Sequence, residues 1–476
     1  MAKAGFFEQT NRYVLPNLID YGKVYDSFRW DKYVTELSGL PDGGLNIAYE
    51  AVDRHAGSSL RNRIAIRWLG RDGSTEEFSY RRLKEVTDRF ANVLQELGIG
   101  KGAVVSTLAG RIPDLYIAAL GAFKQGSVFC PLSPASGQES IFRQLNEAKA
   151  RVLVTTEAHY RHTLEKGVDQ LPHLEYILLT DVDKTQDRST YSLKVLMSKA
   201  DKQLNICPTD PDDAALFHFT RGATGKPKGV IHVHKAALTH YITGKFVLDF
   251  HRDDIFWCTA DPGRATGIIY GLLSPLLHGI TNLVVEAECD APLWYQTLEE
   301  EMVTVWYTAP SDIRHLMQSH IDVNSELNLN ALRLVQSGGE PLHPEAARWS
   351  LETLDMPVLE HWWQAETGGI MIANFPGMKV KPGSVGRPLP GISAAIVQKG
   401  KSGKRLRFVE EPGETGQLAL KAGWTSMFRG YLGQARQYSD SFVDGWYLTG
   451  DWAQKDADGY FWILDRAEQG ESKTAP

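Results

Sequence analysis

Residues 220–229 read Thr-Arg-Gly-Ala-Thr-Gly-Lys-Pro-Lys-Gly, and they are the most informative stretch of this chain. The apolar run over 216–220 predicts a strand before them, and the pattern over 235–247 predicts a helix after them. Three glycines and the two lysines that flank Pro227 make a loop whose N–H groups and cations can surround a phosphate. The order Gly-Lys-Ser/Thr of a Walker A loop does not occur in register. The stretch therefore favours a phosphate-binding loop at a strand end over a plain glycine-rich surface turn.

Strands and helices alternate along most of the chain. Apolar runs over 103–108, 127–132 and 151–155 predict strands that are separated by helices of about a dozen residues, and the pattern resumes over 214–375. Ser79 is followed by apolar residues at helical spacing, which predicts a capped helix there. Such alternation is typical of βαβ units and parallel sheets, so the sequence predicts an α/β fold.

The character of the sequence changes near residue 383. Short strands and many glycines follow, with few helical periods, and Asp458-Gly459 is typical of a hairpin turn. We therefore expect an N-terminal arm at 1–60, an α/β body of two βαβ sheet subdomains at 61–382, a smaller β-rich subdomain at 383–466 and a flexible tail at 467–476.

The composition excludes several functional classes. Of 476 residues, 43% are hydrophobic and 23% are charged, as in ordinary globular proteins. With 51 basic and 58 acidic residues the net charge is −7, which argues against nucleic acid as the main partner. No apolar run approaches the roughly 18 residues that span a bilayer, and no export signal is recognised. The four cysteines are scattered without metal-ligand spacing, so we expect a cytoplasmic protein.

Three further loops follow expected strands and carry residues suited to a ligand. Residues 261–267 read Asp-Pro-Gly-Arg-Ala-Thr-Gly, in which Arg264 is either a surface arginine or an anion contact. Residues 337–341 read Ser-Gly-Gly-Glu-Pro, and residues 362–369 read Trp-Trp-Gln-Ala-Glu-Thr-Gly-Gly. Two tryptophans beside a carboxylate suit a planar ring and a metal or phosphate, although each motif alone is more often core packing. Because ligands of α/β sheets bind at strand ends, four such loops predict one shared site.

Three other patterns are not favoured. His232 and His234 would share one face of a strand, as metal ligands can, but no third ligand is evident nearby. Residues 454–465 partly match a calcium loop, but Gln is first, Asp is last and no helices flank them, so a hairpin is expected. A Ser/His/Asp triad has no support, because Gly-x-Ser-x-Gly is absent.

The loops together resemble those of the AMP-forming acetyl-CoA synthetases, within the adenylate-forming acyl-CoA ligases, luciferases and peptide-synthetase adenylation domains. The resemblance covers nearly all of residues 20–466, with motifs in the family's order at 220–229, 257–263, 338–345, 362–369, 381–388, 445–452 and 458–466. It implies the fold of the large N-terminal body of an adenylate-forming enzyme. It also implies a two-step reaction, in which ATP and a carboxylate give an acyl-adenylate and pyrophosphate, and CoA thiol then attacks the mixed anhydride.

The resemblance further implies ligands and residue roles. ATP or AMP, Mg²⁺, CoA and a small carboxylic acid are the expected ligands. The expected adenine contacts are Gly339, Glu340, Pro341, Glu360, His361 and Trp362, and the expected ribose contacts are Asp451 and Arg466. The expected pyrophosphate contacts are Thr220, Gly222, Thr224, Gly225 and Lys226, and Glu366 is the expected Mg²⁺ ligand. Thr220, Lys226 and Glu366 are the expected catalytic residues. The acyl pocket would be bounded by Arg264, Ala265, Thr266, Gly338 and Trp363.

The sequence also departs from the family's pattern. The chain stops just after Arg466, where family members continue for on the order of 100 residues as a mobile domain that carries a catalytic lysine. Other departures are Arg221 and Ala223 in the phosphate loop, Arg264 in place of the tryptophan that floors the acyl pocket, Ala365 before the metal glutamate, and residues 469–472 at the hinge. From these departures we expect little acyl-CoA formation by the chain alone.

Several alternatives therefore stay open at this stage. The chain is an adenylate-forming ligase, a pseudoenzyme that binds nucleotide without turnover, or a body whose C-terminal domain or acyl-acceptor protein is supplied in trans. Arg264 raises a second choice. If the side chain of Arg264 points into the acyl pocket, its permanent charge favours a ligand with a second anionic group, and this is the arrangement we expect. If the side chain points outward, the pocket is longer and apolar.

Overall fold

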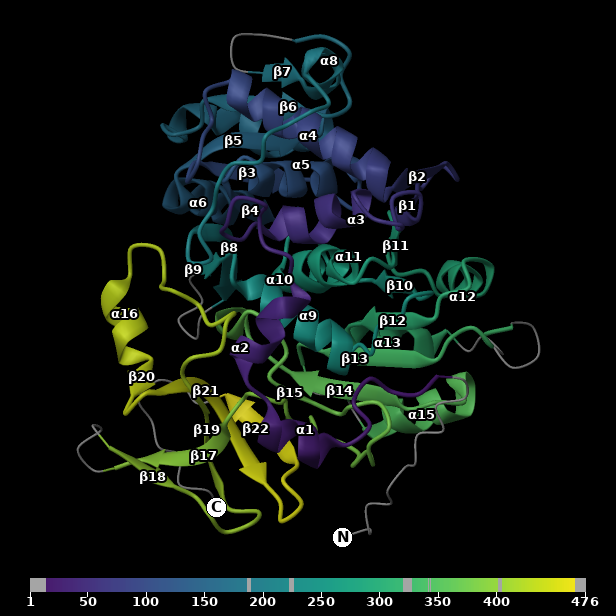
Figure 1. Cartoon of the computed structure of the whole chain (residues 1–476), viewed down its shortest axis with the longest axis vertical. Helices are drawn as coiled ribbons and strands as arrows, with labels where there is room; N and C mark the ends of the chain where they lie inside the picture. The colour runs from purple at the N-terminus through teal and green to yellow at the C-terminus, as the bar shows by residue number, and fades with distance from the viewer. Residues whose placement is uncertain are drawn as a thin grey trace.

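The chain forms three sheets, of which the seven-stranded sheet lies at one end of the long axis and the other two lie next to each other toward the opposite end (Figure 1). The computed structural model describes residues 14–185, 190–221, 227–319, 328–340, 342, 344–400 and 405–466. Two of the sheets are mainly parallel and are covered by helices, and the third is antiparallel. This mixed α/β architecture confirms the fold class expected from the alternation of strands and helices.

The seven-stranded sheet lies at the top of Figure 1, in the order β7-β6-β5-β3-β4-β8-β9. Its strands are parallel except for β9, which forms an antiparallel hairpin with β8. The strands are β3 (Val104–Leu108), β4 (Val128–Leu132), β5 (Ala150–Thr155), β6 (Tyr176–Leu179), β7 (Thr190–Ser192), β8 (Ala214–Arg221) and β9 (Pro227–Val233). The expected strands over 103–108, 127–132 and 151–155 are therefore confirmed.

Helices cover both faces of this sheet. They are α4 (Tyr80–Glu96), α5 (Pro113–Lys124), α6 (Gln138–Ala148), α7 (Glu157–His159), α8 (Leu193–Lys199) and the turns Tyr160–Leu164 and Glu165–Gln170. Ser79 begins α4 as expected, because its side-chain oxygen accepts a hydrogen bond from the backbone N of Arg82 at 3.2 Å. The apolar stripe of α4, which includes Leu83 and Phe90, is fully buried.

The nine-stranded sheet has the order β16-β15-β14-β13-β12-β10-β11-β1-β2. Its strands are β1 (Ile64–Leu69), β2 (Thr75–Ser79), β10 (Ile255–Cys258), β11 (Thr281–Val285), β12 (Val305–Thr308), β13 (Leu334–Gly338), β14 (Val358–Trp362), β15 (Ile372–Ala373) and β16 (Arg387–Pro388). Its helices are α9 (Ala236–Phe246), α10 (Ala265–Ile268), the turn Ile269–Leu273, α11 (Ser274–Leu277), α12 (Ala291–Glu300), α13 (Pro310–Gln318) and α15 (Pro344–Leu354). The six central strands are parallel, so their carboxyl ends meet at one edge.

The third sheet is antiparallel and lies at the lower left of Figure 1. It consists of β17 (Ala394–Lys399), β18 (Leu406–Phe408), β19 (Thr415–Lys421), β20 (Phe442–Val443), β21 (Trp446–Lys455) and β22 (Phe461–Arg466), with helix α16 (Ala435–Asp440) beside it. This sheet begins at Ala394, after the change of character near residue 383, and β16 at Arg387–Pro388 still belongs to the nine-stranded sheet.

The segment that partly matches a calcium loop is a hairpin between β21 and β22. One carboxylate oxygen of Asp456 accepts hydrogen bonds from the backbone N of Asp458 (3.0 Å) and of Tyr460 (2.9 Å). Lys381 Nζ forms ion pairs with Asp456 and, at 2.6 Å, with Asp458. A lysine ammonium therefore occupies the space beside the two carboxylates that a cation would need.

The N-terminal arm is more helical than its irregular sequence suggests. It contains α1 (Tyr21–Ser27), α2 (Trp30–Tyr33), the turn Val34–Glu36, the π-helical turn Tyr49–Asp53 and α3 (Arg54–Ala56). In Figure 1 α1 and α2 lie across strands from the last third of the chain. Hydrogen bonds between aromatic side chains of the arm and backbone carbonyls hold it there, so the arm is a strap between distant segments.

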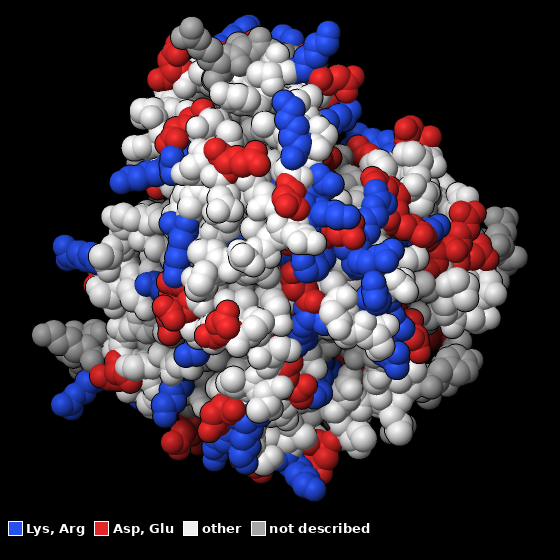
Figure 2. All heavy atoms as spheres, turned by 45° about the horizontal axis from the view of Figure 1, so that its top comes forward, with Lys and Arg blue, Asp and Glu red and all other residues white. Residues whose placement is uncertain are grey.

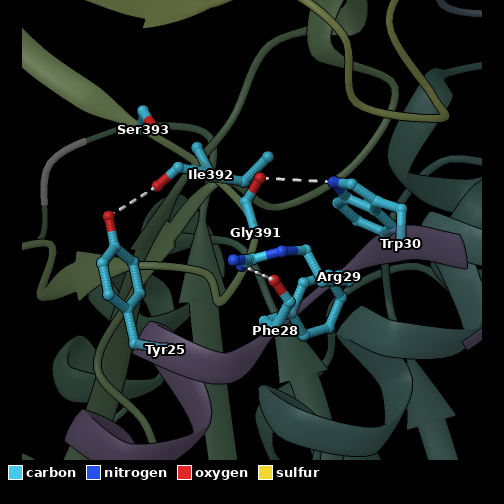
Figure 3. A pocket seen from close by; sticks show the side chains of 7 residues that line it. All are labelled: Tyr25, Phe28, Arg29, Trp30, Gly391, Ile392 and Ser393. Atoms are coloured by element: carbon cyan, nitrogen blue, oxygen red, sulfur yellow. Dashed lines mark hydrogen bonds between the residues drawn. The ribbon is translucent and has the colours of Figure 1, made fainter. Parts of the chain in front are cut away.

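The contacts of this strap enclose a small pocket of about 280 Å³ (Figure 3). Tyr25 Oη donates to the carbonyl of Ile392 at 2.9 Å, and Trp30 Nε1 donates to that of Gly391 at 3.2 Å. Arg29 stretches across the opening and donates to the carbonyl of its neighbour Phe28 at 2.7 Å. The polar groups of the two aromatic rings are therefore used for docking the arm.

A buried ionic network joins the arm to the first helices. Lys124 Nζ on α5 is fully buried and lies 2.8 Å from Asp53 and 2.6 Å from Asp88, while Lys84 contacts both carboxylates from the rim. Burial raises the pKa of Asp53, and the nearby Lys124 ammonium opposes that rise. Buried charges need such partners, so the network fixes the π-helical turn against α4 and α5.

The surface carries both signs of charge in mixture. On the face drawn in Figure 2, lysines and arginines alternate with aspartates and glutamates, without an extended basic stripe. Among the described residues, no helix is both long and apolar enough to cross a membrane.

Candidate functional site

The two large sheets meet where the loops after β4 and β10 touch. Gly263, in the loop after β10, lies so close to Ser133 that an added Cβ would come within 2.3 Å of the Ser133 Cα. Ser133 Oγ donates to Asp261 Oδ2 at 2.5 Å, and the backbone N of Gly263 donates to Asp261 Oδ1 at 2.8 Å. The strand ends of both sheets therefore face one seam, as ligand sites of α/β folds do.

Glu366 lies on a short turn directly after β14, facing the β8–β9 hairpin. Its carboxylate accepts a hydrogen bond from Tyr431 Oη at 2.9 Å. The ring of Tyr431 lies 5.4 Å from Lys228 Nζ, and Lys228 pairs with Thr220 across the hairpin. The Glu366 turn, the Tyr431 ring and the hairpin that carries Lys228 and the predicted catalytic Thr220 are thus brought together from three parts of the chain.

Asp451, on β21, is buried at the end of β14. One of its carboxylate oxygens accepts hydrogen bonds from Trp362 Nε1 (2.8 Å) and Gln364 Nε2 (2.9 Å). Tyr447 Oη donates to Gln364 Oε1 at 2.9 Å, which orients the amide. Across β21 and β22, Asp451 is the register partner of Arg466, the other residue predicted at the ribose. The indole N–H of Trp362 is therefore committed to Asp451.

Glu360 and His361 precede this turn on β14 and are both buried. Burial raises the pKa of Glu360 to about 7, although its acceptance of a hydrogen bond from the backbone N of Leu342 at 2.9 Å opposes the rise. Burial lowers the pKa of His361 to about 3, so its imidazole is neutral at pH 7. The two groups are neighbours on one strand, so their side chains point to opposite faces of the sheet. At pH 7 His361 is neutral and Glu360 is only partly ionised.

The orientation of His361 follows from its neighbours. His361 Nδ1 lies 3.2 Å from the amide oxygen of Gln336, which can only accept, so Nδ1 carries the proton. Nε2 then accepts from Tyr307 Oη at 2.7 Å. Gly338 is required beside it, because an added Cβ would lie 2.3 Å from His361 Nε2.

An aromatic group borders the predicted acyl pocket. Trp363 Nε1 donates to Tyr307 Oη at 3.3 Å, and the ring of Trp363 meets that of Tyr270 edge-on at 5.4 Å. Tyr270 Oη in turn accepts from the backbone N of Ile370 at 2.8 Å. These contacts fix the indole of Trp363 in one orientation.

Arg264 does not have the inward, buried orientation that we expected. Its side chain is 61% exposed, and its Nε lies 3.6 Å from Asp261. Ala265 and Thr266 follow it as the first residues of α10. The guanidinium remains hydrated and faces a carboxylate, so it is not an unpaired buried charge that demands an anionic ligand.

Other predicted site residues lie at the edge of the described structure or outside it. Glu340 is exposed and forms an ion pair with Arg314 at 3.0 Å, and Gly339 adopts a positive φ of 108° that favours glycine. The predictions for Gly222, Thr224, Gly225, Lys226 and Pro341, and for the side chains of Arg221 and Arg466, fall outside the described residues.

The two histidines on β9 and beyond it do not form a metal pair. Nε2 of His232 faces the carbonyl of Ala365, whereas Nδ1 of His234 lies 3.2 Å from the backbone N of Ile47. Burial lowers the pKa of both histidines to about 4, so both are neutral at pH 7. Within the described part of the chain, no group of three His, Cys, Asp or Glu side chains is placed to hold a metal by itself.

Sequence reasoning missed several residues that shape this site. Tyr431, Tyr307 and Gln364 contact Glu366, His361 and Asp451. The two tyrosines lie outside the recognised motifs, and Gln364 lies within the motif at 362–369 but was given no role. The segment around Tyr431 pairs with β9 through a bridge to Val230. No local signal predicts such a pairing, because it joins residues about 200 positions apart.

Comparisons with known proteins agree with this geometry. Residues 52–432 match the family model described as "AMP-binding enzyme". The chain is 38% identical to the acetyl-coenzyme A synthetase of Bacillus subtilis (strain 168), over 95% of this chain and 78% of that protein. It is 32% identical to the acetyl-coenzyme A synthetase of Pyrobaculum aerophilum, over 92% of this chain and 71% of that protein.

A solved structure shows the same fold. The crystal structure of a Brucella canis acyl-CoA synthetase superposes with a TM-score of 0.84 at 28% sequence identity, covering 94% of this chain and 80% of that one. The chain therefore belongs to the AMP-binding enzyme family. Its curated relatives named above are acetyl-coenzyme A synthetases, which confirms the resemblance drawn from the seven motifs.

Proposed function

We propose that this chain binds ATP and a small carboxylic acid and joins them into an acyl-adenylate, the first half-reaction of an acyl-CoA ligase. The observation that carries the proposal is the placement of Glu366 in the turn after β14 and of Asp451 against Trp362 and Gln364, which lead into that turn. Lys228 and its register partner Thr220 lie on the hairpin beside Tyr431, whose hydroxyl binds the first of these carboxylates. This arrangement suits a nucleotide whose ribose lies at Asp451 and whose phosphates lie at the hairpin.

The chemistry of the first step explains these residue types. A carboxylate is a poor electrophile, and attachment of AMP supplies a good leaving group. Negative charge develops on the phosphate oxygens, where backbone N–H groups and lysines stabilise it most. The proposed roles of Thr220 and Lys226 are to hold the departing pyrophosphate, while Glu360 and His361 border the adenine.

Magnesium fits the residues present. Mg²⁺ prefers oxygen ligands and usually combines one or two carboxylates with phosphate oxygens and water. Glu366 offers one partly exposed carboxylate, oriented by Tyr431. A bound Mg²⁺ would neutralise phosphate charge, and Glu366 would be its protein ligand.

The proposed second substrate is CoA, whose thiol would attack the mixed anhydride. This part of the proposal is supported by the acyl-CoA and acetyl-coenzyme A synthetase names of the relatives. The proposed acyl donor is a small carboxylic acid whose apolar chain would lie against the aromatic group around Trp363.

Carboxylate-dependent exchange of pyrophosphate into ATP tests the proposal. We expect exchange above the acid-free blank with the full chain, and loss of at least 90% of it in Glu366→Gln. AMP binding without any exchange by the wild type would contradict the proposal and support the alternative of a nucleotide-binding protein without turnover.

A further inference from the structure

The turn that carries Glu366 is anchored by two imidazoles from outside it. Nε2 of the His232 imidazole lies 2.7 Å from the carbonyl of Ala365, and Nδ1 lies 3.2 Å from that of Ser426. The neutral ring has one N–H, and we assign it to Nε2 because that contact is the shorter. The carbonyl of Gly368 accepts a hydrogen bond from His240 Nε2 at 2.9 Å. The two carbonyls flank Glu366 on either side, so both ends of its turn are tied to the same imidazole-bearing segment.

The carbonyls between them are held as well. The carbonyl of Glu366 accepts from the backbone N of Phe428 at 3.1 Å. The carbonyl of Thr367 accepts from Trp424 Nε1 at 2.8 Å and from Ser426 Oγ at 2.7 Å. Four consecutive carbonyls therefore have partners outside the turn, which leaves its backbone little freedom to move.

The packing around His232 is equally tight. Gly368 has a positive φ of 65°, and an added Cβ there would lie 2.8 Å from His232 Cε1 and 2.4 Å from the carbonyl of Ser426. The imidazole thus fills the space beneath the turn. Since protein interiors are close-packed, a shorter side chain at position 232 would leave a void. It would also remove the shorter of two hydrogen bonds at the Ala365 carbonyl, which otherwise accepts, within the described part of the chain, only from the backbone N of Gly368 at 3.1 Å.

Both histidines come from the segment that directly follows the predicted phosphate-binding loop. His232 is on β9 and His240 is on α9, the strand and helix that follow the predicted phosphate-binding loop. Lys228 lies earlier on the same strand, β9, beside the ring of Tyr431. The hydroxyl of Tyr431 donates to the carboxylate of Glu366. One continuous segment therefore sets the position of both the phosphate loop and the carboxylate.

We propose that His232 is a positioning residue that holds the Glu366 turn in register with the phosphate-binding hairpin. It touches neither nucleotide nor acid and acts through the carbonyl of Ala365. The inference rests on the proposed function, because it gives Glu366 a role at the metal-bound phosphates.

The test uses two uncharged replacements that differ in reach. The amide of Gln at position 232 extends to where Nε2 lies and can donate to the Ala365 carbonyl, whereas the shorter amide of Asn cannot. His234→Asn is the matched control, because His234 is also buried and close on the chain but contacts the backbone of Ile47 instead. AMP binding without metal reports whether each variant is folded.

The main readout is the factor by which Mg²⁺ strengthens ATP binding in calorimetry. We expect His232→Asn to reduce this factor at least tenfold, while AMP affinity stays within threefold of wild type. His232→Gln and His234→Asn are expected to keep the factor within threefold. In pyrophosphate exchange, His232→Asn should lower kcat more than it raises the KM for acid.

The outcomes separate the two proposals. Equal losses in His232→Asn and His234→Asn would overturn the positioning role and leave the proposed function intact. If His232→Asn does not fold, the test rests on His232→Gln. A tenfold loss of the Mg²⁺ effect on ATP binding in that variant overturns the inference, and an unchanged Mg²⁺ effect supports it. A wild type whose ATP affinity does not respond to Mg²⁺ would contradict the proposed role of Glu366, and the inference would fall with it.

Discussion

At the scale of single residues, Asp451 is the side chain on which nucleotide binding is expected to depend most. A charge-assisted contact to ribose hydroxyls contributes about 1.5–3 kcal/mol. We therefore expect Asp451→Ala to weaken AMP binding at least tenfold in calorimetry. Because Asp451 also accepts from Trp362 and Gln364, Asp451→Asn and a thermal melt serve as controls for folding. Unchanged affinity in a folded variant would remove Asp451 from the site.

Glu360 provides a second prediction, on pH dependence. Its pKa rises from 4.5 to about 7 on folding because the carboxyl is buried. The folded state then binds a proton that the unfolded state has lost, so stability falls as pH rises from about 4.5 to 7. Glu360→Gln removes this loss, and its stability advantage over wild type should grow between pH 5 and pH 8, by at most about 3 kcal/mol. If the stability difference between Glu360→Gln and wild type were the same at pH 5 and at pH 8, burial of the Glu360 carboxyl would not be the cause.

The exposed position of Arg264 predicts which acids the pocket accepts. Its charge faces Asp261 and solvent, so an anionic second group on the acid gains no buried ion pair. In a thermal-shift panel with ATP, hexanoate should stabilise the protein at least as much as succinate does. Arg264→Ala should leave that order unchanged. Selective stabilisation by succinate or malonate that disappears in Arg264→Ala would restore the inward interpretation.

At the scale of elements, the N-terminal arm is held by its tyrosines. Tyr21 Oη donates at 2.8 Å to the buried carbonyl of Pro388. Tyr21→Phe keeps the ring and the stacked Arg387, whose Cζ lies 4.2 Å from the ring centroid, but it leaves that carbonyl unpaired. We expect a loss of roughly 1–3 kcal/mol in urea unfolding.

Tyr25→Phe is the control for this loss, because Tyr25 is only partly buried and water can replace its hydroxyl at the Ile392 carbonyl. Its cost should stay below about 1 kcal/mol. Equal losses in both variants would show that burial of the carbonyl does not decide the effect.

At the scale of the whole molecule, the buried network around Lys124 joins the arm to the α/β body. Lys124→Met leaves the carboxylates of Asp53 and Asp88 buried without the fully buried cation that contacts both of them. Removal of one partner from a buried ion pair costs about 3–5 kcal/mol, and we expect that loss in urea unfolding at pH 8. The loss should be smaller at pH 5, because protonation removes the repulsion between the two carboxylates.

Lys84→Met tests whether burial is the reason. Lys84 contacts the same two carboxylates, but its side chain is 35% exposed. Solvent screens such a pair, so its loss should cost no more than about 1 kcal/mol. If Lys84→Met lost as much unfolding free energy as Lys124→Met, the partly exposed Lys84 would be the cation that stabilises the two carboxylates.

The sequence by itself determined the local features of this protein. Strands such as Val104–Leu108 and the cap at Ser79 follow from residue patterns within a few positions, and the seven motifs identified the family before any fold was known. These signals are local, because backbone periodicity and turn chemistry act over one or two turns of chain. The hairpin at residues 454–465 was predicted in the same way, and against the calcium alternative.

Only the tertiary structure decided which of these pieces touch. Local pattern did not predict that β1 and β2 would join the far edge of the second large sheet, that Trp362 would donate to Asp451, or that His232 would hold the carbonyl of Ala365, 133 residues away. It also left the orientation of Arg264 open, and the structure resolved it against our expectation. Such contacts depend on how whole sheets pack and on which buried polar groups find partners, and those requirements are satisfied across the molecule rather than along the chain.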